Sequence, residues 1–183
     1  MRAPRSFFVV PFVIVSSALS AQTPAPPLTP ETLPKFLTNC ERSLIPLEGA
    51  YGEIENDPLP LNDENGQPLG HRPLEDRRRA LADLRDTLHK LSDKPLDLRL
   101  ALKLVFETED LTDDLYDLSQ IAYDNDREDL GKRLSDLMTP LDRDRAQIES
   151  YTLTLAEETE ARAEELEKRN QELEQTRKGP VKK

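Results

Sequence analysis

The chain has 183 residues, a formal net charge of −11 at pH 7 and one cysteine. Its acidic excess repels phosphate groups, which argues against binding to nucleic acid or to an anionic lipid surface. A single cysteine rules out an internal disulfide, and the absence of tryptophan leaves leucine as the main material for a core.

The first 21 residues have the pattern of a secretory signal peptide. Arg2 and Arg5 precede a mostly apolar run over 7–15, and mostly small residues follow at 16–21. The run is too short to span a bilayer, which takes about 20 apolar residues. We therefore expect an exported protein, periplasmic in a Gram-negative bacterium and otherwise secreted, without stable membrane insertion after cleavage. Cleavage removes two arginines and no acid, which changes the net charge from −11 to −13.

A proline-rich leader over 22–29 precedes the first expected helix. Thr29 and Pro30 stand in the order of an N-cap and a first helical residue. From there to about residue 56, apolar residues recur in alternating steps of four and three, which predicts a helix packed against other helices. Pro46 is expected to kink it. The apolar residues of this helix are Leu33, Leu37, Cys40, Leu44, Leu47, Tyr51 and Ile54.

Cys40 belongs to this apolar face. A free cysteine in such a position is usually a small buried side chain. The alternative is a disulfide between two chains, which an exported protein permits.

The segment 56–72 interrupts the helical pattern and is expected to form a long loop. Its prolines and the pair Asn65-Gly66 predict turns. A connection of this length is uncommon in a compact domain, so the loop is either functional or simply flexible.

Two further helices are expected, over about 73–91 and from 95 to about 123. Leucines at helical spacing mark the first of them. In the second, leucines from 96 to 104 alternate with other residues, which is the period of a strand. Leu, Ala, Arg and Lys nevertheless favour a helix, and helical spacing resumes at Leu111.

A last, longer helix is expected after Asn125, which has the spacing of a capping pair with Glu128. Its apolar seam is dense as far as about residue 156 and is then continued only by Leu166 and Leu173. Charge pairs four residues apart support a helix there without a core. We therefore divide the processed chain into a helical bundle over 30–156 and a charged helical extension with a basic tail over 157–183.

The turns at 92–94 and 124–126 are so short that the helices they join must be antiparallel neighbours. The predicted fold is all-α, an antiparallel bundle of about four helices with a long, protruding C-terminal helix of coiled-coil character. The long loop leaves the direction of the first helix open.

The strongest concentration of charge lies between residues 107 and 129, with ten acids and one base. Glu107, Asp110, Asp114 and Asp117 are three and four residues apart and share one helix face. This acidic face is interpreted either as a site for a basic partner or a hard divalent cation, or as a set of acids paired inside the bundle. The candidate internal partners are Arg77, Arg78 and Arg79 near residues 108–110, Arg133 near Asp117, and Arg143 near Glu107.

Side chains that carry chemistry are scarce. The histidines are His71 and His89, and Met138 is the one methionine after the signal. Neither histidine has a ligand at the spacing of a metal site, no nucleophile stands beside a base, and no glycine-rich phosphate loop is present. We therefore predict that the protein is not an enzyme and has no catalytic residue, cofactor or metal site. No small-molecule substrate is evident.

The segment Leu28-Thr29-Pro30-Glu31-Thr32 resembles the start of the Leu-Thr-x-x-Gln motif of periplasmic stress chaperones, and Leu111-Thr112-Asp113-Asp114-Leu115 stands where a second copy is expected. Both segments lack the glutamine of that motif. The resemblance implies an exported, helical, disulfide-free protein with a chaperone-like role.

The sequence as a whole favours a non-catalytic exported helical protein that acts through macromolecular contacts, in an interaction or structural role in the cell envelope. The expected partner is another protein or a second copy of the chain, which contacts the last helix or the acidic face. The alternative is a periplasmic chaperone-like or cation-responsive stress protein.

Overall fold

The computed structural model describes residues 26–63 and 65–177, and it is all-helical over them. Its helices are α1 (Leu33–Ser43), α2 (Ile45–Asn56), α3 (His71–Asp93), α4 (Leu98–Asp124) and α5 (Glu128–Arg177). The predicted signal peptide, the start of the leader and the basic tail lie outside the described residues.

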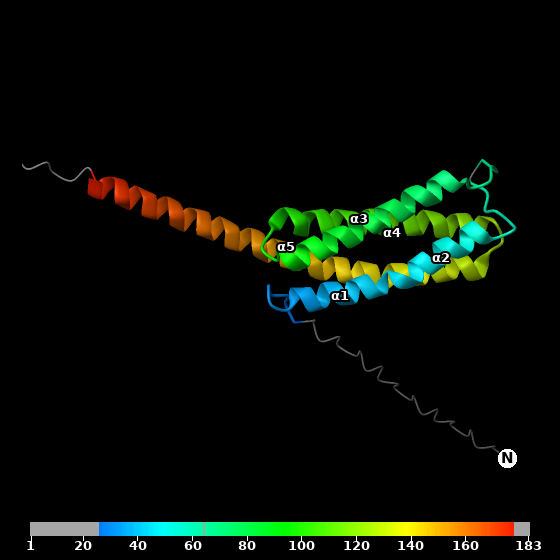
Figure 1. Ribbon diagram of the computed structural model, residues 1–183, viewed down its shortest axis with the longest axis horizontal. Helices are drawn as coiled ribbons and strands as arrows, with labels where there is room; N and C mark the ends of the chain where they lie inside the picture. Colours follow the sequence, from blue (N-terminus) through cyan, green and yellow to red (C-terminus); the bar gives the residue numbers. More distant parts are fainter. Residues whose placement is uncertain (1–25, 64, 178–183) are drawn as a thin grey trace, which may run out of the picture.

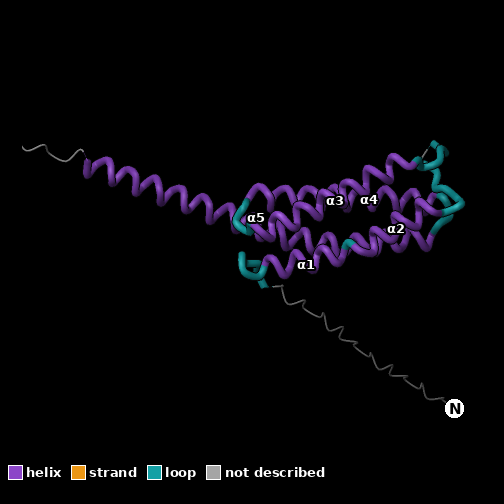
Figure 2. Tube along the Cα trace, in the orientation of Figure 1, coloured by secondary structure: helices purple, strands orange, loops and turns teal. Residues whose placement is uncertain are grey.

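The helices form an antiparallel bundle, as predicted. Helices α1 and α2 run end to end as one rod, and α3, α4 and α5 are the other three (Figures 1 and 2). Helix α4 packs along α3 and α5, and the α1–α2 rod packs on α3 and α5 from the other side. The rod runs antiparallel to both α3 and α5 (Figure 1), so the structure settles the direction that the long loop left open.

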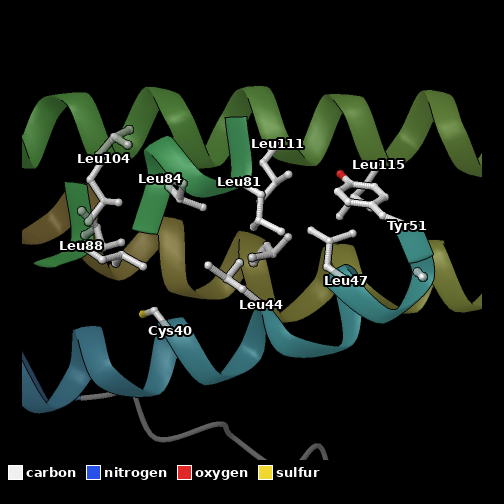
Figure 3. Close-up of a cluster of buried hydrophobic side chains, with 14 of the residues drawn as sticks. Cys40, Leu44, Leu47, Tyr51, Leu81, Leu84, Leu88, Leu104, Leu111 and Leu115 are labelled. Carbon is white, nitrogen blue, oxygen red and sulfur yellow. The ribbon is translucent and has the colours of Figure 1, made fainter. Parts of the chain in front are cut away.

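The core is built from leucine, and its members come from every helix. Figure 3 shows Leu44, Leu47 and Tyr51 directed toward leucines of α3 and α4. All buried apolar side chains of the described chain lie between Leu33 and Leu155. Every apolar residue predicted for the first helix is buried, because the steps of three and four keep them on one side of the rod.

The first rod is interrupted at Leu44, two residues before Pro46. Proline has no amide hydrogen to donate to the carbonyl of Arg42. The amides of Leu44 and Leu47 instead bond three residues back, to Glu41 (3.2 Å) and to Leu44 (3.1 Å). The predicted kink is therefore present as a short break between α1 and α2.

Side chains bond the backbone in the turn before α1 and at the start of α4. Thr29 and Thr32 exchange bonds, from the amide of Thr29 to Oγ1 of Thr32 (2.9 Å) and from the amide of Thr32 to Oγ1 of Thr29 (3.4 Å). The regular helix begins just after them, at Leu33. At α4 the carboxylate of Asp97 accepts from the amides of Arg99 (3.1 Å) and Leu100 (3.3 Å), which satisfies donors that the first turn leaves free.

The prediction that Asn125 caps the last helix is wrong. Its side chain donates to the carbonyls of Ile121 (2.7 Å) and Asn62 (2.8 Å), and its oxygen accepts from the amide of Asn62 (2.9 Å). Asn125 therefore ends α4 and fastens the long loop to the α4–α5 turn. The sequence spacing missed this because the partner is 63 residues away.

The loop between α2 and α3 has internal structure. Gly66 adopts a φ of 73° and closes the predicted turn with a bond from its amide to the carbonyl of Asp63 (2.9 Å). Beyond the turn, Asn62 pairs with Pro68. Leu61 is 3 % exposed, so the loop also contributes to the core.

Candidate interaction surfaces

Helix α5 continues beyond the bundle as an isolated rod (Figure 1). We call residues 157–177 the extension. Every described side chain from 157 to 176 is exposed, including Leu166 (60 %) and Leu173 (58 %). Nothing in the described chain therefore covers the apolar side chains of the extension.

The exposed leucines continue the face that α5 buries inside the bundle. Ile148, Leu155, Leu166 and Leu173 are separated by 7, 11 and 7 residues, and each of these steps returns to within about 20° of the same direction at 3.6 residues per turn. Ile148 and Leu155 are 1 % and 3 % exposed. The bundle ends, but the apolar stripe of α5 does not.

The stripe on the extension is narrow and has charged edges. We call it the extension face, and its members are Thr159, Ala163, Leu166, Asn170 and Leu173. Glu160, Glu167 and Glu174 follow one edge, and Arg162 and Arg169 follow the other. Glu158 bonds Arg162 at 3.0 Å, as predicted for charges four residues apart. The pattern is that of a short coiled-coil seam with an asparagine in it.

The base of the extension is attached to the end of the bundle. The hydroxyl of Tyr151 donates to the carbonyl of Pro95 in the α3–α4 turn (2.6 Å), and Tyr151 is 3 % exposed. The extension therefore leaves the bundle from a fixed point.

The acidic face of α4 divides into paired and unpaired residues. Glu107 bonds Lys103 at 2.5 Å. Asp114 lies 3.7 Å from Arg77 of α3. Asp110 and Asp117 are exposed, and neither has an ion pair in the described part of the chain. Two of the four predicted residues thus have internal partners and two face solvent.

Asp114 lies beside a buried polar cluster. Burial raises the pKa of its carboxyl, while Arg77 opposes this rise. Tyr51 is fully buried, and neither its hydroxyl nor Nε of Arg77 has a hydrogen-bond partner among the described residues. Desolvation raises the pKa of Tyr51 to about 12. Tyr51 therefore stays protonated further into the alkaline range than an exposed tyrosine does.

Arg78 and Arg79 of α3 do not pair with residues 108–110 as predicted. Arg78 bonds Glu55 of α2 at 2.7 Å, and Arg79 lies 3.6 Å from Asp76 of its own helix.

Two predicted ion pairs of α5 are also wrong. Arg133 bonds Glu53 of α2 at 2.6 Å rather than Asp117, and Arg143 lies 3.9 Å from Asp144 rather than near Glu107. For Arg133 the cause is the position of the first rod, because α2 also packs against α5 and brings Glu53 within reach. Arg143 instead meets an acid of its own helix.

Four large apolar side chains of α4 that the sequence did not single out are exposed. Phe106, Tyr116 and Tyr123 are 58 %, 54 % and 39 % exposed, and Leu102 is 41 % exposed. Their positions lie outside the helical spacing of the buried seam of α4, and this spacing is the feature of the sequence that indicates their exposure. Asp110, Asp113 and Asp117 are interspersed with them in the sequence.

The histidines do not form a site with other ligands. His89 bonds Glu41 of α1 at 3.0 Å across an open depression of about 280 Å3 between α1 and α3. Among the described residues, no group of three or more His, Cys, Asp or Glu side chains is arranged to hold a metal ion. None of the described helices is both long and apolar enough to cross a membrane.

Cys40 is a free, buried thiol, 6 % exposed, on the inner side of α1. Burial raises its pKa, and the nearby carboxylate of Asp144 raises it further. Asp144 accepts hydrogen bonds from Cys40 and from Ser43 (3.5 Å). A thiol held protonated and out of solvent is unreactive, which fits the interpretation of Cys40 as a small core side chain.

Comparison with known proteins places the chain in no family, because no family model, no curated protein and no solved structure matches it.

Proposed function

We propose that the protein is a non-catalytic exported protein that acts in the cell envelope by holding another macromolecule on the extension. The observation that carries this proposal is the uncovered continuation of the α5 stripe, with Leu166 and Leu173 at 60 % and 58 % exposure. The signal-like first 21 residues support export.

The energetics favour a partner on this face. Burying one leucine side chain stabilises a complex by about 1.5–3 kcal/mol. An isolated helix of about 20 residues gains little from charge pairs, about 0.2–0.5 kcal/mol each. Burial of the exposed leucines by a partner would therefore stabilise the helix of the extension more than its own charge pairs do.

Site-specific photo-crosslinking in the exporting cell tests the proposal. A photoreactive residue is placed at Leu166 in one variant and at Leu153 in another. Leu153 is a matched control, since it is 62 % exposed on the same helix but lies about 120° away from the extension face. We expect a discrete protein adduct from position 166 and none from position 153.

The Leu173→Ser substitution adds a second check on the crosslink. It removes apolar contact on the extension face without changing charge, so the adduct at 166 should weaken. No adduct at 166, or equal adducts at both positions, contradicts the proposal.

A second candidate, a chaperone-like role, has its own observation in the exposed Phe106 and Tyr116 of α4. Exposed aromatic side chains offer apolar contact to unfolded chains. The test is suppression of client aggregation at substoichiometric amounts by the whole protein. A Phe106→Ser/Tyr116→Ser variant should lose this activity, and inactivity of the unmodified protein toward several clients contradicts the role.

A further inference from the structure

We infer that the occupant of the extension face is a basic amphipathic helix of a different protein and not a second copy of this chain. This inference rests on the proposed function, which states only that the face is a binding surface. The path of α5 through the bundle and the charges along the two edges of the extension face both favour this occupant.

A parallel pair of extensions has complementary edges. In a parallel pair the Arg162 and Arg169 edge of one copy faces the Glu167 and Glu174 edge of the other. The bundle nevertheless blocks this arrangement. The extension face continues the buried face of α5, which α4 and α1 cover inside the bundle. A parallel second copy would have to continue its own α5 through the space that α4 and α1 occupy.

An antiparallel pair has room, since each bundle then lies beyond the tip of the other extension. The charges along the facing edges of such an antiparallel pair are nevertheless not complementary. The two-fold axis of an antiparallel pair places each edge opposite the same edge of the second copy. The edge with Glu160 and Glu167 therefore faces glutamates, and the edge with Arg169 faces arginines. Like charges opposed across an interface are unfavourable.

The charge of the extension indicates what does bind. Residues 157–177 carry eight acidic and four basic side chains. Arg162 is already neutralised by Glu158, while Glu160 and Glu167 border the leucines. A helix with apolar residues on one side and lysine or arginine beside them satisfies both the stripe and its acidic edge.

The first experiment measures the mass of the full processed protein by sedimentation equilibrium over a wide range of concentration. We expect a monomer throughout. A dimer that disappears in a Leu166→Ser/Leu173→Ser variant would overturn the inference, because it would show that a second copy occupies the face.

The second experiment measures binding of two model peptides of about three heptads by fluorescence anisotropy. One peptide has a leucine stripe flanked by lysine, and its matched partner has glutamate in place of lysine. We expect the lysine peptide to bind at least about tenfold more tightly than the glutamate peptide. Its binding should weaken at high salt.

Variants locate the binding of the lysine peptide. The Leu166→Ser/Leu173→Ser variant should weaken it by about tenfold or more, Glu160→Gln/Glu167→Gln should weaken it, and Leu153→Ser should leave it unchanged. Equal binding of both peptides, or insensitivity to the leucine variant, overturns the inference. A crosslink at position 166 combined with such a result would refute the basic partner while leaving the proposed function intact.

Discussion

Individual residues show where the bundle has no spare room. A Cβ built on Gly131 of α5 would lie 2.9 Å from Cε2 of the Tyr123 ring, whereas a Cβ on Gly49 of α2 meets nothing within 4 Å. The ring of Tyr123 therefore lies directly over the backbone of α5. A Cβ at this position requires the ring to shift.

The two glycines should respond in opposite directions to alanine. Gly49→Ala should stabilise the protein by about 0.5–1 kcal/mol through helix propensity. Gly131→Ala gains the same propensity but displaces the ring, and overpacking costs about 1–3 kcal/mol, so we expect net destabilisation. Urea unfolding of both variants measures the difference, and a stabilised Gly131→Ala variant would show that the ring moves aside freely.

Asp144 is a half-buried carboxylate whose charge the bundle disfavours. Burial raises the pKa of its carboxyl above the ordinary value of 3.8, although Ser43, Cys40 and Arg143 oppose the rise. The native state therefore takes up a proton at a higher pH than the unfolded chain does. By linkage, this carboxyl destabilises the fold at neutral pH, and the loss is recovered as pH falls through the raised pKa toward 3.8.

An Asp144→Asn variant should therefore melt at a higher temperature than the parent protein at pH 7. The gain should shrink as pH falls toward about 4, because the parent carboxyl is then protonated in the native state. Thermal melts of both proteins over this range give the measurement. Asp142→Asn, at an exposed carboxylate on the same helix, is the control. A variant less stable at pH 7 would show that the bonds from Ser43 and Cys40 outweigh burial.

At the level of elements, one side chain joins segments far apart in the chain. Asn125 ends α4 and makes two hydrogen bonds to the backbone of Asn62 in the long loop. Arg127 reinforces this junction through its ion pair with Asp57, just after α2. The loop is thus held at the end of the bundle opposite the extension (Figure 1).

Asn125→Ala should loosen the loop and lower stability by about 1–2 kcal/mol, since a typical hydrogen bond contributes about 0.5–1.5 kcal/mol. Hydrogen exchange of the amide of Asn62 should become faster, and exchange in the middle of α3 should not. Gln67→Ala is the control, because Gln67 bonds the loop through its backbone. Unchanged exchange at Asn62 would contradict the role of Asn125.

At the level of the whole molecule, the core and the candidate binding surface occupy different parts of the chain. All buried apolar residues of the described chain lie at or before Leu155, and the extension begins after them. The bundle is therefore expected to fold without the extension.

Removal of residues 157–183 should leave the melting temperature within about 2 °C of the full protein, as for surface changes that touch no core residue. The truncated protein should bind the lysine peptide no better than the Leu166→Ser/Leu173→Ser variant. A melting temperature lowered by more than about 5 °C would show that the extension contributes to the bundle.

The sequence by itself determined the helices and their buried sides. Leucines three and four residues apart have one common direction on a helix, so the all-α bundle and the long last helix were predictable from spacing alone. The extension was visible too, as the point where that spacing thins out to Leu166 and Leu173.

Only the tertiary structure decided which residues from distant segments meet. The partners of Asn125 and Arg133 depend on where the loop and the first rod lie against α4 and α5, and spacing along one helix contains no information about a neighbour more than 60 residues away. The same holds for the extension face. The charges of the extension face alone permit a parallel pair of chains. The helices packed around α5 in the bundle occupy the space that the parallel second copy would need.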